Sequence, residues 1–565
     1  MLALLSLPDL RRRAALFGWM LVAALPVAYI AVVVIAASRN IVFWDEFDTA
    51  LDLIIRMNAG AGSDEILGRL VALNNEHRMV TSRLLFAASY WLTGTVNFAF
   101  VGAIGNLFMV ATCVILVLAV RGTERRVRLG VVLAFLMFQL EHFENFIWSG
   151  ASIDHFQVVT LAVGAIVALA RGSGGGVALA GALALTATFT LAHGSLVWPV
   201  GAALLAHQRR WRQLGAWIAA GTVALLLFLW GFKFNPGHNI SALTWESVGA
   251  MLRYWLALLG APLTLGHAGF APLPGVLLLG SLGVLAARGA LAREPIAMFV
   301  ALYVLGALAL VAFGRAEIAG AEINSRYMVL GALAWALLLF MLLERLTPPD
   351  RPYLALAGAL PALAALALTA NVKFSPQVEG FVEVRDRAAT RFTQYGEDGR
   401  GIAPLHPRPG HAEVLLRIAA ERGLYTLPVL SRRAEFPEPA TNLSLERHID
   451  ELIVNDHAVT VGGWAMRLGH VSRRGQVHLV LRSPQSTLFF STITLQRPDV
   501  ATAHQQPDWR LAGFRAVITR ERLPAEDFEV GVLIKDGDRV EYAMTPNRLL
   551  LAAGSEARAE RGAGQ

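Results

Sequence analysis

Long apolar runs separated by short polar loops fill the first 370 residues of the chain. A bilayer core of about 30 Å needs roughly 20 residues of helix to cross it. The runs that meet or approach this length are 14–37, 97–120, 129–147, 153–170, 177–192, 195–207, 213–232, 272–288, 295–313, 327–343 and 352–370. We therefore expect an α-helical polytopic membrane protein with about 11 spans, within a range of roughly 9 to 13.

Two further apolar stretches, 79–94 and 248–264, are short and contain an internal arginine each, Arg83 and Arg253. We expect these stretches to lie at the membrane interface. The first run follows three arginines and so resembles a signal peptide, but it is longer than the usual apolar region of about 7 to 15 residues. We therefore expect it to remain as the first span.

The pattern changes after the last apolar run. Residues 372–440 mix a polar helix near 410–423 with loops that contain Pro and Gly, and from about 445 the apolar period becomes two. Strands are predicted at 458–461, 477–481, 488–494, 514–518 and 528–534. Short strands with short turns are typical of a β-sandwich. The predicted domains are 1–371 in the membrane, 372–440 as a linker, 441–552 as a β-sandwich and 553–565 as a disordered tail.

Composition supports this division. Charged residues make up 16% of the chain, against about 25% in soluble proteins. Residues 371–565 carry 25 basic and 24 acidic side chains, so the tail is almost neutral, and the excess of six basic residues lies in the first 370 residues. The net charge of +7 therefore gives no basic surface for nucleic acid, and we expect no such partner.

The arginines between apolar runs predict the orientation. With 11 spans, fifteen arginines fall on one side, as the positive-inside rule requires of the cytoplasmic side. They are Arg11, Arg12, Arg13, Arg121, Arg125, Arg126, Arg128, Arg171, Arg209, Arg210, Arg212, Arg288, Arg293, Arg345 and Arg351. We expect a bacterial inner-membrane protein with a cytoplasmic N-terminus and a periplasmic C-terminal domain. The single cysteine, Cys113, excludes an internal disulfide and a cysteine zinc site.

In this orientation the costly polar residues gather on the outer side, where ionisable groups near a membrane usually mark a site. Asp45 and Glu46 follow the first span directly, and the flanking Trp44 and Phe47 would hold them at a fixed depth. We predict a functional role for these two carboxylates. For the nearby Asp48, Asp52, Asp64 and Glu65, a solvated loop is the simpler interpretation.

Other polar residues of the outer side are candidates for substrate binding. Glu141 and Glu144 share a helix face, although hydrogen bonding to Asn145 or Gln157 would explain them equally well. Arg315 and Arg326 lie where the positive-inside rule would not place them, which favours a bound anion over snorkelling. The predicted binding set is Trp44, Glu76, His77, Arg78, Glu141, His142, Glu144, Asn145, Asp154, His155, Gln157, Lys233, Arg315, Arg326 and Tyr327.

These features resemble the GT-C class of polytopic glycosyltransferases. The resemblance covers roughly residues 10–345 and rests on the first span followed by Trp44-Asp45-Glu46, the long first outer loop, the dozen or so spans and the soluble C-terminal domain. Further local similarity to bacterial members lies at 75–78, 144–157, 314–315 and 325–327.

The resemblance implies transfer of a hexosyl or pentosyl group from a polyprenyl-phosphate carrier to a glycan or lipid-linked acceptor on the periplasmic side, with inversion. It implies an acidic base in the first outer loop, either Asp45 or Glu46. No cofactor is indicated, although Glu and His pairs leave room for a divalent cation. The alternatives are a transporter or flippase of a lipid-linked glycan, a polysaccharide polymerase, and a membrane acyltransferase that uses His142, His155 or His193.

Overall fold

The chain divides into two compact units. The computed structural model describes residues 7–233, 244–316, 322–395, 402–425, 427, 431 and 433–560, with gaps in the last range at 437–439, 442–444, 455–457, 468–475, 496, 521–522, 537–538 and 552–557. The first unit comprises Met1–Arg385 and Leu405–Thr426, and the second comprises Asp386–Pro404 and Leu427–Gln565. The first unit thus extends past residue 371 and includes part of the segment expected to be a linker.

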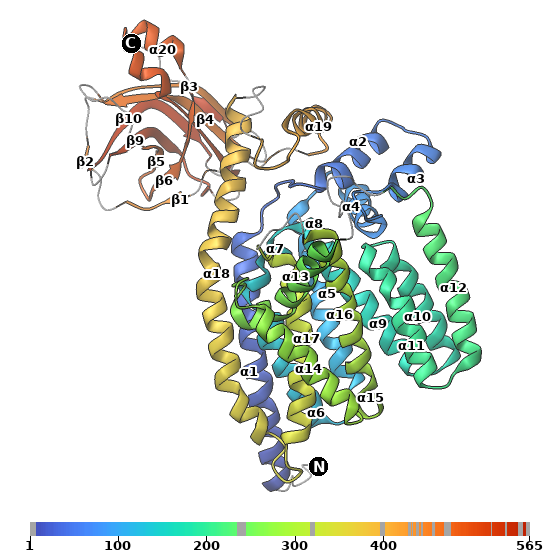
Figure 1. Cartoon of the computed structure of the whole chain (residues 1–565). Coiled ribbons are helices and arrows are strands. Elements are labelled where there is room, and N and C mark those ends of the chain that lie inside the picture. The colour runs from blue at the N-terminus through green and yellow to red at the C-terminus, as the bar shows by residue number, and fades with distance from the viewer. Residues whose placement is uncertain are drawn as a thin grey trace, which may run out of the picture. The chain divides into compact units, whose positions relative to one another are not determined.

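The first unit is a helical bundle (Figure 1). In the part of the chain that the structure describes, seven helices are long and apolar enough to cross a membrane, or eight if the bent pair α6 (Thr123–Met137) and 140–147 is one span. This indicates a membrane protein. The seven helices are α1 (Leu7–Ala37), α5 (Phe98–Ala119), α8 to α9 (Ser149–Ala170), α12 (Trp211–Leu229), α16 (Pro295–Arg315), α17 (Ser325–Leu346) and α18 (Leu354–Tyr395).

The predicted count of eleven spans is not confirmed. Three of the predicted spans form α10 (Gly174–Thr188), α11 (Val197–His207) and α14 (Pro272–Ala287), of 15, 11 and 16 residues. At 1.5 Å per residue, even the longest of these is about 24 Å, which is shorter than the hydrocarbon core. The two stretches expected at the interface form the helices α4 (Val80–Thr93) and α13 (Trp245–Thr264).

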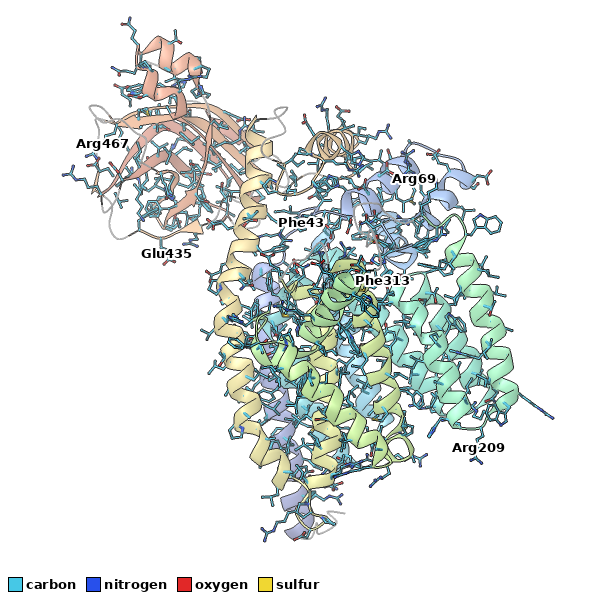
Figure 2. The ribbon with its side chains drawn as sticks, viewed as in Figure 1. Phe43, Arg69, Arg209, Phe313, Glu435 and Arg467 are labelled. Atoms are coloured by element: carbon cyan, nitrogen blue, oxygen red, sulfur yellow. The ribbon has the colours of Figure 1, made fainter. Side chains whose placement is uncertain are left out.

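Several of the basic loops meet at one end of the bundle. Arg12 pairs with Glu124, which joins the start of α1 to the start of α6. Arg125 and Arg128 both bind Glu344 near the end of α17, at 2.6 and 2.7 Å. Figure 2 shows Arg209 at this end and Phe43 and Phe313 at the opposite end. The structure thus brings together charged groups that the sequence places on one side.

The first loop after α1 folds into short helices at the other end of the bundle. They are η1 (Phe47–Leu51), α2 (Asp52–Asn58), α3 (Ser63–Val71) and α4. The segment 402–425, which contains α19 (Pro409–Glu421), is fastened to this loop. Trp44 N donates to Leu405 O at 2.8 Å, and the Tyr425 hydroxyl accepts from Val42 N at 3.0 Å. A late part of the chain therefore stabilises the loop that carries the acidic pair.

The second unit contains two sheets that share one hydrophobic core. One has the order β1-β6-β5-β9-β10-β11 with β2 beside β10, and the other has the order β3-β4-β8-β7. The predicted strands are present within β4 to β9. The strand bounds are β1 (Arg433–Ala434), β2 (Ala440–Thr441), β3 (Leu445–Val454), β4 (Ala458–Arg467), β5 (Gln476–Arg482), β6 (Thr487–Ser491), β7 (Ile493–Leu495), β8 (Gly513–Thr519), β9 (Phe528–Asp536), β10 (Arg539–Leu550) and β11 (Arg558–Glu560), and α20 (Pro498–Ala503) precedes η5 (Pro507–Leu511).

The tail expected to be disordered, 553–565, contains one strand. Residues Arg558–Glu560 form β11, which pairs antiparallel with β10. An exposed edge of β10 can accept further backbone hydrogen bonds, which explains how a polar segment can join the sheet. The remaining residues of this tail, 553–557 and 561–565, lie outside the described residues.

Candidate active site

A cavity of about 320 Å³ lies beside the first loop. Its wall is built from the first loop and α4, from α8 (Ser149–Ala151) with η3 (Ser152–Phe156), from η4 (Ala192–Leu196), and from α12, α16 and the start of α17. The cavity brings together nine residues that the sequence singled out. They are Asp45, Glu46, Glu76, His77, Asp154, His155, Arg315, Arg326 and Tyr327.

The two carboxylates of the acidic pair differ in their surroundings. Glu46 is buried, and its two oxygens accept hydrogen bonds from Phe43 N at 2.7 Å, Gly150 N at 2.6 Å and the Ser149 hydroxyl. Asp45 is half-buried and lines the cavity, and its carboxylate has no hydrogen-bond partner among the described residues. Glu46 therefore anchors the loop to α8, whereas the Asp45 carboxylate remains available.

Burial dominates the electrostatics of Glu46. It raises the pKa of Glu46 to about 7, against the lowering effect of the three hydrogen bonds and of Arg385. Gly150 makes this close approach possible, because an added Cβ there would lie only 3.3 Å from Glu46 Oε1 and 3.1 Å from Trp148 Nε1.

Two π-helical turns flank the cavity. One, η1, begins directly after Glu46, and the other, η3, contains Asp154 and His155. Single π-helical turns inside helices occur often at functional sites. Asp154 accepts a hydrogen bond from the Ser82 hydroxyl, which joins η3 to α4.

The backbone of the first loop is strained around the cavity. Trp44, Asn75 and Met79 have φ values of 50°, 53° and 49°, in the left-handed region that residues other than glycine rarely adopt. Such strain persists only where the surrounding contacts impose it. Here Met79 N donates to Thr190 O at 3.2 Å and Val80 N to Phe189 O at 2.9 Å, which ties the loop to the end of α10.

Two arginines supply the positive charge of the cavity, Arg315 at the end of α16 and Arg326 at the start of α17. The Arg326 guanidinium carbon lies 5.4 Å from the ring centre of Trp148, and its buried Nε has no hydrogen-bond partner among the described residues. An orphaned buried donor of this kind suits an anionic ligand.

Glu144 and Asn145 hold the first turn of α17 in place. Glu144 accepts from Ser325 Oγ at 3.0 Å and from Arg326 N at 3.2 Å, and Asn145 donates to Arg326 O at 2.9 Å. A carboxylate is favourable at a helix N-terminus. These two residues do not line the cavity and instead position Arg326.

One wall of the cavity is apolar and reaches the exposed surface of the bundle. It consists of side chains from α12 and α16, among which Leu229, Leu310 and Phe313 are 53%, 38% and 43% exposed. The cavity thus combines a polar part against the first loop with an apolar part between α12 and α16.

Six more residues of the predicted set do not line the cavity. Trp44 is 43% exposed, Lys233 is exposed, and Glu141, His142 and Gln157 are buried inside the bundle. Arg78 is buried because its guanidinium donates to Phe228 O at 2.8 Å, to Val71 O at 2.7 Å and to Trp230 O. It satisfies carbonyls at the end of α12, so it is not free to bind an anion.

Two histidines of the wall are held neutral. Burial lowers the pKa of His77 to about 3 and that of His193 to about 4. His77 Nδ1 accepts from Ala192 N at 3.2 Å, and His193 Nδ1 lies 2.9 Å from the Tyr303 hydroxyl. Neutral imidazoles of this kind can bind hydroxyl groups.

Several lining residues were absent from the predicted set, namely Ser82, Trp148, Gly150 and His193. A serine or glycine inside an apolar stretch carries no distinctive signal. His193, at the junction of two short apolar runs, was named for the acyltransferase alternative, and Trp148 lies in the stretch 144–157 that resembles the GT-C class. In the described residues, no group of three His, Cys, Asp or Glu side chains has the arrangement of a metal site.

Neither the models of known protein families nor the curated proteins match the sequence. Among solved structures, the chain is similar to the oligosaccharyltransferase of Archaeoglobus fulgidus, crystallised with zinc and sulfate, at 14% identity and a TM-score of 0.34. The match covers 74% of this chain and 59% of that chain. A likeness at this level establishes neither family nor activity, so a functional assignment rests on the chemistry of the cavity.

Proposed function

We propose that the protein is a membrane glycosyltransferase of the GT-C type that transfers a sugar from a polyprenyl-phosphate carrier to a glycan or lipid-linked acceptor. The proposal rests on one observation. A single cavity contains a carboxylate without a hydrogen-bond partner among the described residues, two arginines, and an apolar wall whose side chains are partly exposed on the surface of the bundle. These are the groups that a lipid-linked sugar phosphate requires.

The polar and apolar parts match the parts of such a donor. The prenyl chain would lie between α12 and α16, where Leu310 and Phe313 are partly exposed. The phosphate would lie against Arg315 and Arg326, which bind oxyanions with charge-assisted hydrogen bonds. The sugar would occupy the end lined by Asp45, His77 and His193.

In the proposed reaction, the acceptor hydroxyl oxygen attacks the anomeric carbon and the bond from that carbon to the phosphate oxygen breaks. The Asp45 carboxylate takes the hydroxyl proton as the general base. The departing polyprenyl phosphate gains negative charge, and Arg315 and Arg326 stabilise it. Attack from the face opposite the leaving group inverts the anomeric configuration.

Asp45, not Glu46, is assigned as the base. The Glu46 carboxylate is occupied by three hydrogen bonds, from Phe43 N, the Ser149 hydroxyl and Gly150 N. Glu46 therefore serves as a positioning residue for the loop. Asp45 has no such partners among the described residues and faces the cavity. We place this chemistry on the periplasmic side of a bacterial inner membrane, since the fifteen arginines of the basic loops would face the cytoplasm.

Transfer by the reconstituted full chain tests the assignment. Purified protein in liposomes is supplied with polyprenyl-phosphate sugars and candidate acceptors, and product is measured for wild type, Asp45→Asn and Glu46→Gln. Removal of a general base is expected to lower the rate by about 10²- to 10⁴-fold. Asp64→Asn, on the exposed helix α3, is the matched control and should retain wild-type activity.

The outcomes separate the competing functions. Wild-type rates in Asp45→Asn would contradict the assigned base. Movement of the lipid-linked sugar across the bilayer without transfer would instead identify a transporter. Loss of activity in Asp45→Asn, with binding of the donor retained, supports the proposed role.

A further inference from the structure

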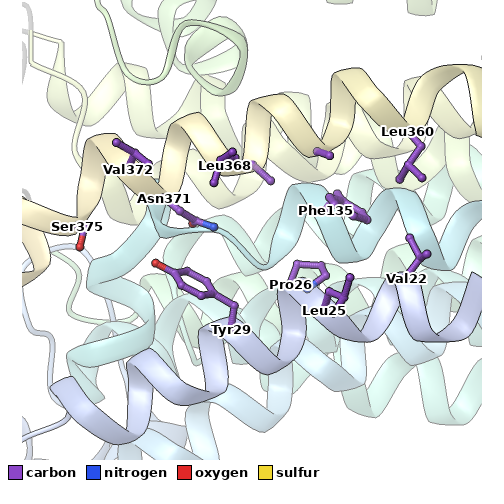
Figure 3. A pocket seen from close by; sticks show the side chains of 12 residues that line it. Val22, Leu25, Pro26, Tyr29, Phe135, Leu360, Leu368, Asn371, Val372 and Ser375 are labelled. Atoms are coloured by element: carbon purple, nitrogen blue, oxygen red, sulfur yellow. The ribbon is translucent and has the colours of Figure 1, made fainter.

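A second cavity, a groove of about 580 Å³, runs between α1 and α18. Figure 3 shows side chains of the two helices facing each other across it, with Phe135 of α6 between them. Ala364 and Ala367 are among the residues of α18 that line it, and Pro26 lines it on α1. No residue of this groove lines the cavity of the proposed active site.

The groove lies within apolar helices and opens to the outside of the bundle. Only 22% of the most apolar stretch of α18 is buried. The rim residues Leu25, Leu368 and Val372 are 67%, 65% and 68% exposed. An empty apolar groove at this depth would forfeit dispersion contacts, and water is absent from the hydrocarbon core. A hydrocarbon chain is the available filling.

The groove is longer than one leaflet, which is about half of the 30 Å hydrocarbon core, and its length suits one extended acyl chain. Leu354, near the lower end of α18, and Ser375 are 21 residues apart, or about 32 Å, which is close to the thickness of the hydrocarbon core. Ser375 therefore lies near the interface on the side of the first loop. From there to Leu360 the groove follows α18 for 15 residues, or about 22 Å.

Polar groups occur together at the Ser375 end of the groove, where Figure 3 shows Tyr29 and Asn371. Asn371 Oδ1 accepts from Leu140 N at 2.9 Å, and its amide NH₂ has no hydrogen-bond partner among the described residues. No lining residue is charged. Lys373, on the same turn of α18, donates to Leu265 O at 2.6 Å and does not line the groove.

We propose that this groove is a binding site for one acyl chain of a glycerophospholipid. The uncharged donors of Tyr29, Asn371 and Ser375 match the uncharged ester carbonyl at the head of an acyl chain. A polyprenyl phosphate carries its anionic phosphate at that position and would require a cation there. The bound lipid fills the space between α1 and α18 and so holds the two helices together.

Lipid analysis of the purified full chain tests this inference. Protein extracted in mild detergent is analysed by native mass spectrometry and by lipid extraction for wild type, Ala364→Trp and the double variant Tyr29→Phe/Ser375→Ala. Ala364→Trp fills the groove and should abolish retention of the phospholipid. The double variant keeps the shape and loses two hydroxyl donors, so we expect retention to fall by about fivefold or more.

Leu107→Trp is the matched control, since Leu107 is 65% exposed on the apolar helix α5 and lies outside the groove. It should retain lipid as wild type does. Retention by Ala364→Trp, or bound polyprenyl phosphate in place of phospholipid, would overturn the inference. If Ala364→Trp does not fold, the double variant decides the question. The readout is bound lipid, so the result is independent of sugar transfer.

Discussion

At the scale of single residues, the neighbouring carboxylates of Asp45 and Glu46 differ in their hydrogen-bond partners and therefore in their proposed roles. Glu46 has its oxygens occupied by backbone and hydroxyl donors, and Asp45 has none among the described residues. The same division applies to the arginines. Arg78 donates to the carbonyls of Val71, Phe228 and Trp230, and Arg326 Nε, beside Trp148, has no hydrogen-bond partner among the described residues. The hydrogen-bond partners, not the residue type, decide which group can meet a substrate.

Glu46 gives a pH prediction. Burial disfavours the charged carboxylate and raises the pKa of Glu46 from its ordinary value of 4.5 to about 7 in the folded protein. Between these values the folded state holds a proton that the unfolded state has lost, so stability falls as pH rises from 4.5 to 7, by about 3 kcal/mol in total. Glu46→Gln removes this titration, and its stability should be flatter over the same range.

Thermal unfolding in detergent at several pH values measures this difference. Glu421→Gln, on an exposed position of α19, is the control and should keep the slope of the wild type. Parallel curves for wild type and Glu46→Gln would show that the Glu46 carboxyl group is not held protonated by burial.

At the scale of elements, the first loop owes its shape to contacts made far along the chain. Asp48 of η1 receives a hydrogen bond from His411 at 2.8 Å and an ion pair from Arg408 at 2.8 Å, and His406 lies 3.5 Å away. Burial alone would raise the pKa of Asp48, but the hydrogen bonds of the two histidines and the charge of Arg408 hold it below its usual range. A charged Asp48 thus links η1 to the segment 402–425.

Asp48→Asn should loosen this link. The variant removes the negative charge that Arg408 and His411 contact. We therefore expect faster amide hydrogen exchange in 402–425 and in 40–48 at neutral pH. Asp64→Asn on α3 is the control, because Asp64 is exposed. Since the pKa of Asp48 is lowered, its contribution is present above pH 4 and is lost as pH falls through the lowered value. Unchanged exchange in both segments would contradict a role for Asp48 in this link.

At the scale of the whole molecule, orientation is the property that the sequence predicts and that labelling can measure. In a Cys113→Ser background, Asp64→Cys lies at the end of the bundle with the first loop, and Gly175→Cys lies on the exposed first turn of α10. An impermeant maleimide should modify Asp64→Cys in intact spheroplasts and Gly175→Cys only after lysis. The reverse pattern would place the cavity in the cytoplasm.

Local patterns predicted much of this fold. Apolar runs gave the positions of the helices, and alternation gave the strands β4 to β9. The number of membrane crossings did not follow, because α10, α11 and α14 are apolar but too short, and α18 continues beyond its apolar part to Tyr395. Whether a short apolar helix crosses the membrane or packs inside the bundle depends on the helices around it.

The candidate site was predicted in part for a related reason. Charged residues beside apolar runs are conspicuous, so Asp45, Arg315 and Arg326 could be singled out. Two of the three acceptors of Arg78 lie about 150 residues away, and two of the three donors to Glu46 lie about 100 residues away, so no local pattern shows that these groups are already satisfied. Glu144 was placed in the right region, but its contact with α17 spans 181 residues.

The attachment of 402–425 to the first loop also has a consequence for biogenesis. Asp45 leaves the ribosome about 360 residues before Leu405, whose carbonyl accepts from Trp44. At about 5–20 residues per second, translation needs roughly 20 to 70 seconds to supply the missing partner. During that interval the newly inserted helices carry an acidic loop without its final support. The protein therefore acquires its mature loop late, and premature termination before residue 405 should leave a membrane-inserted but immature product.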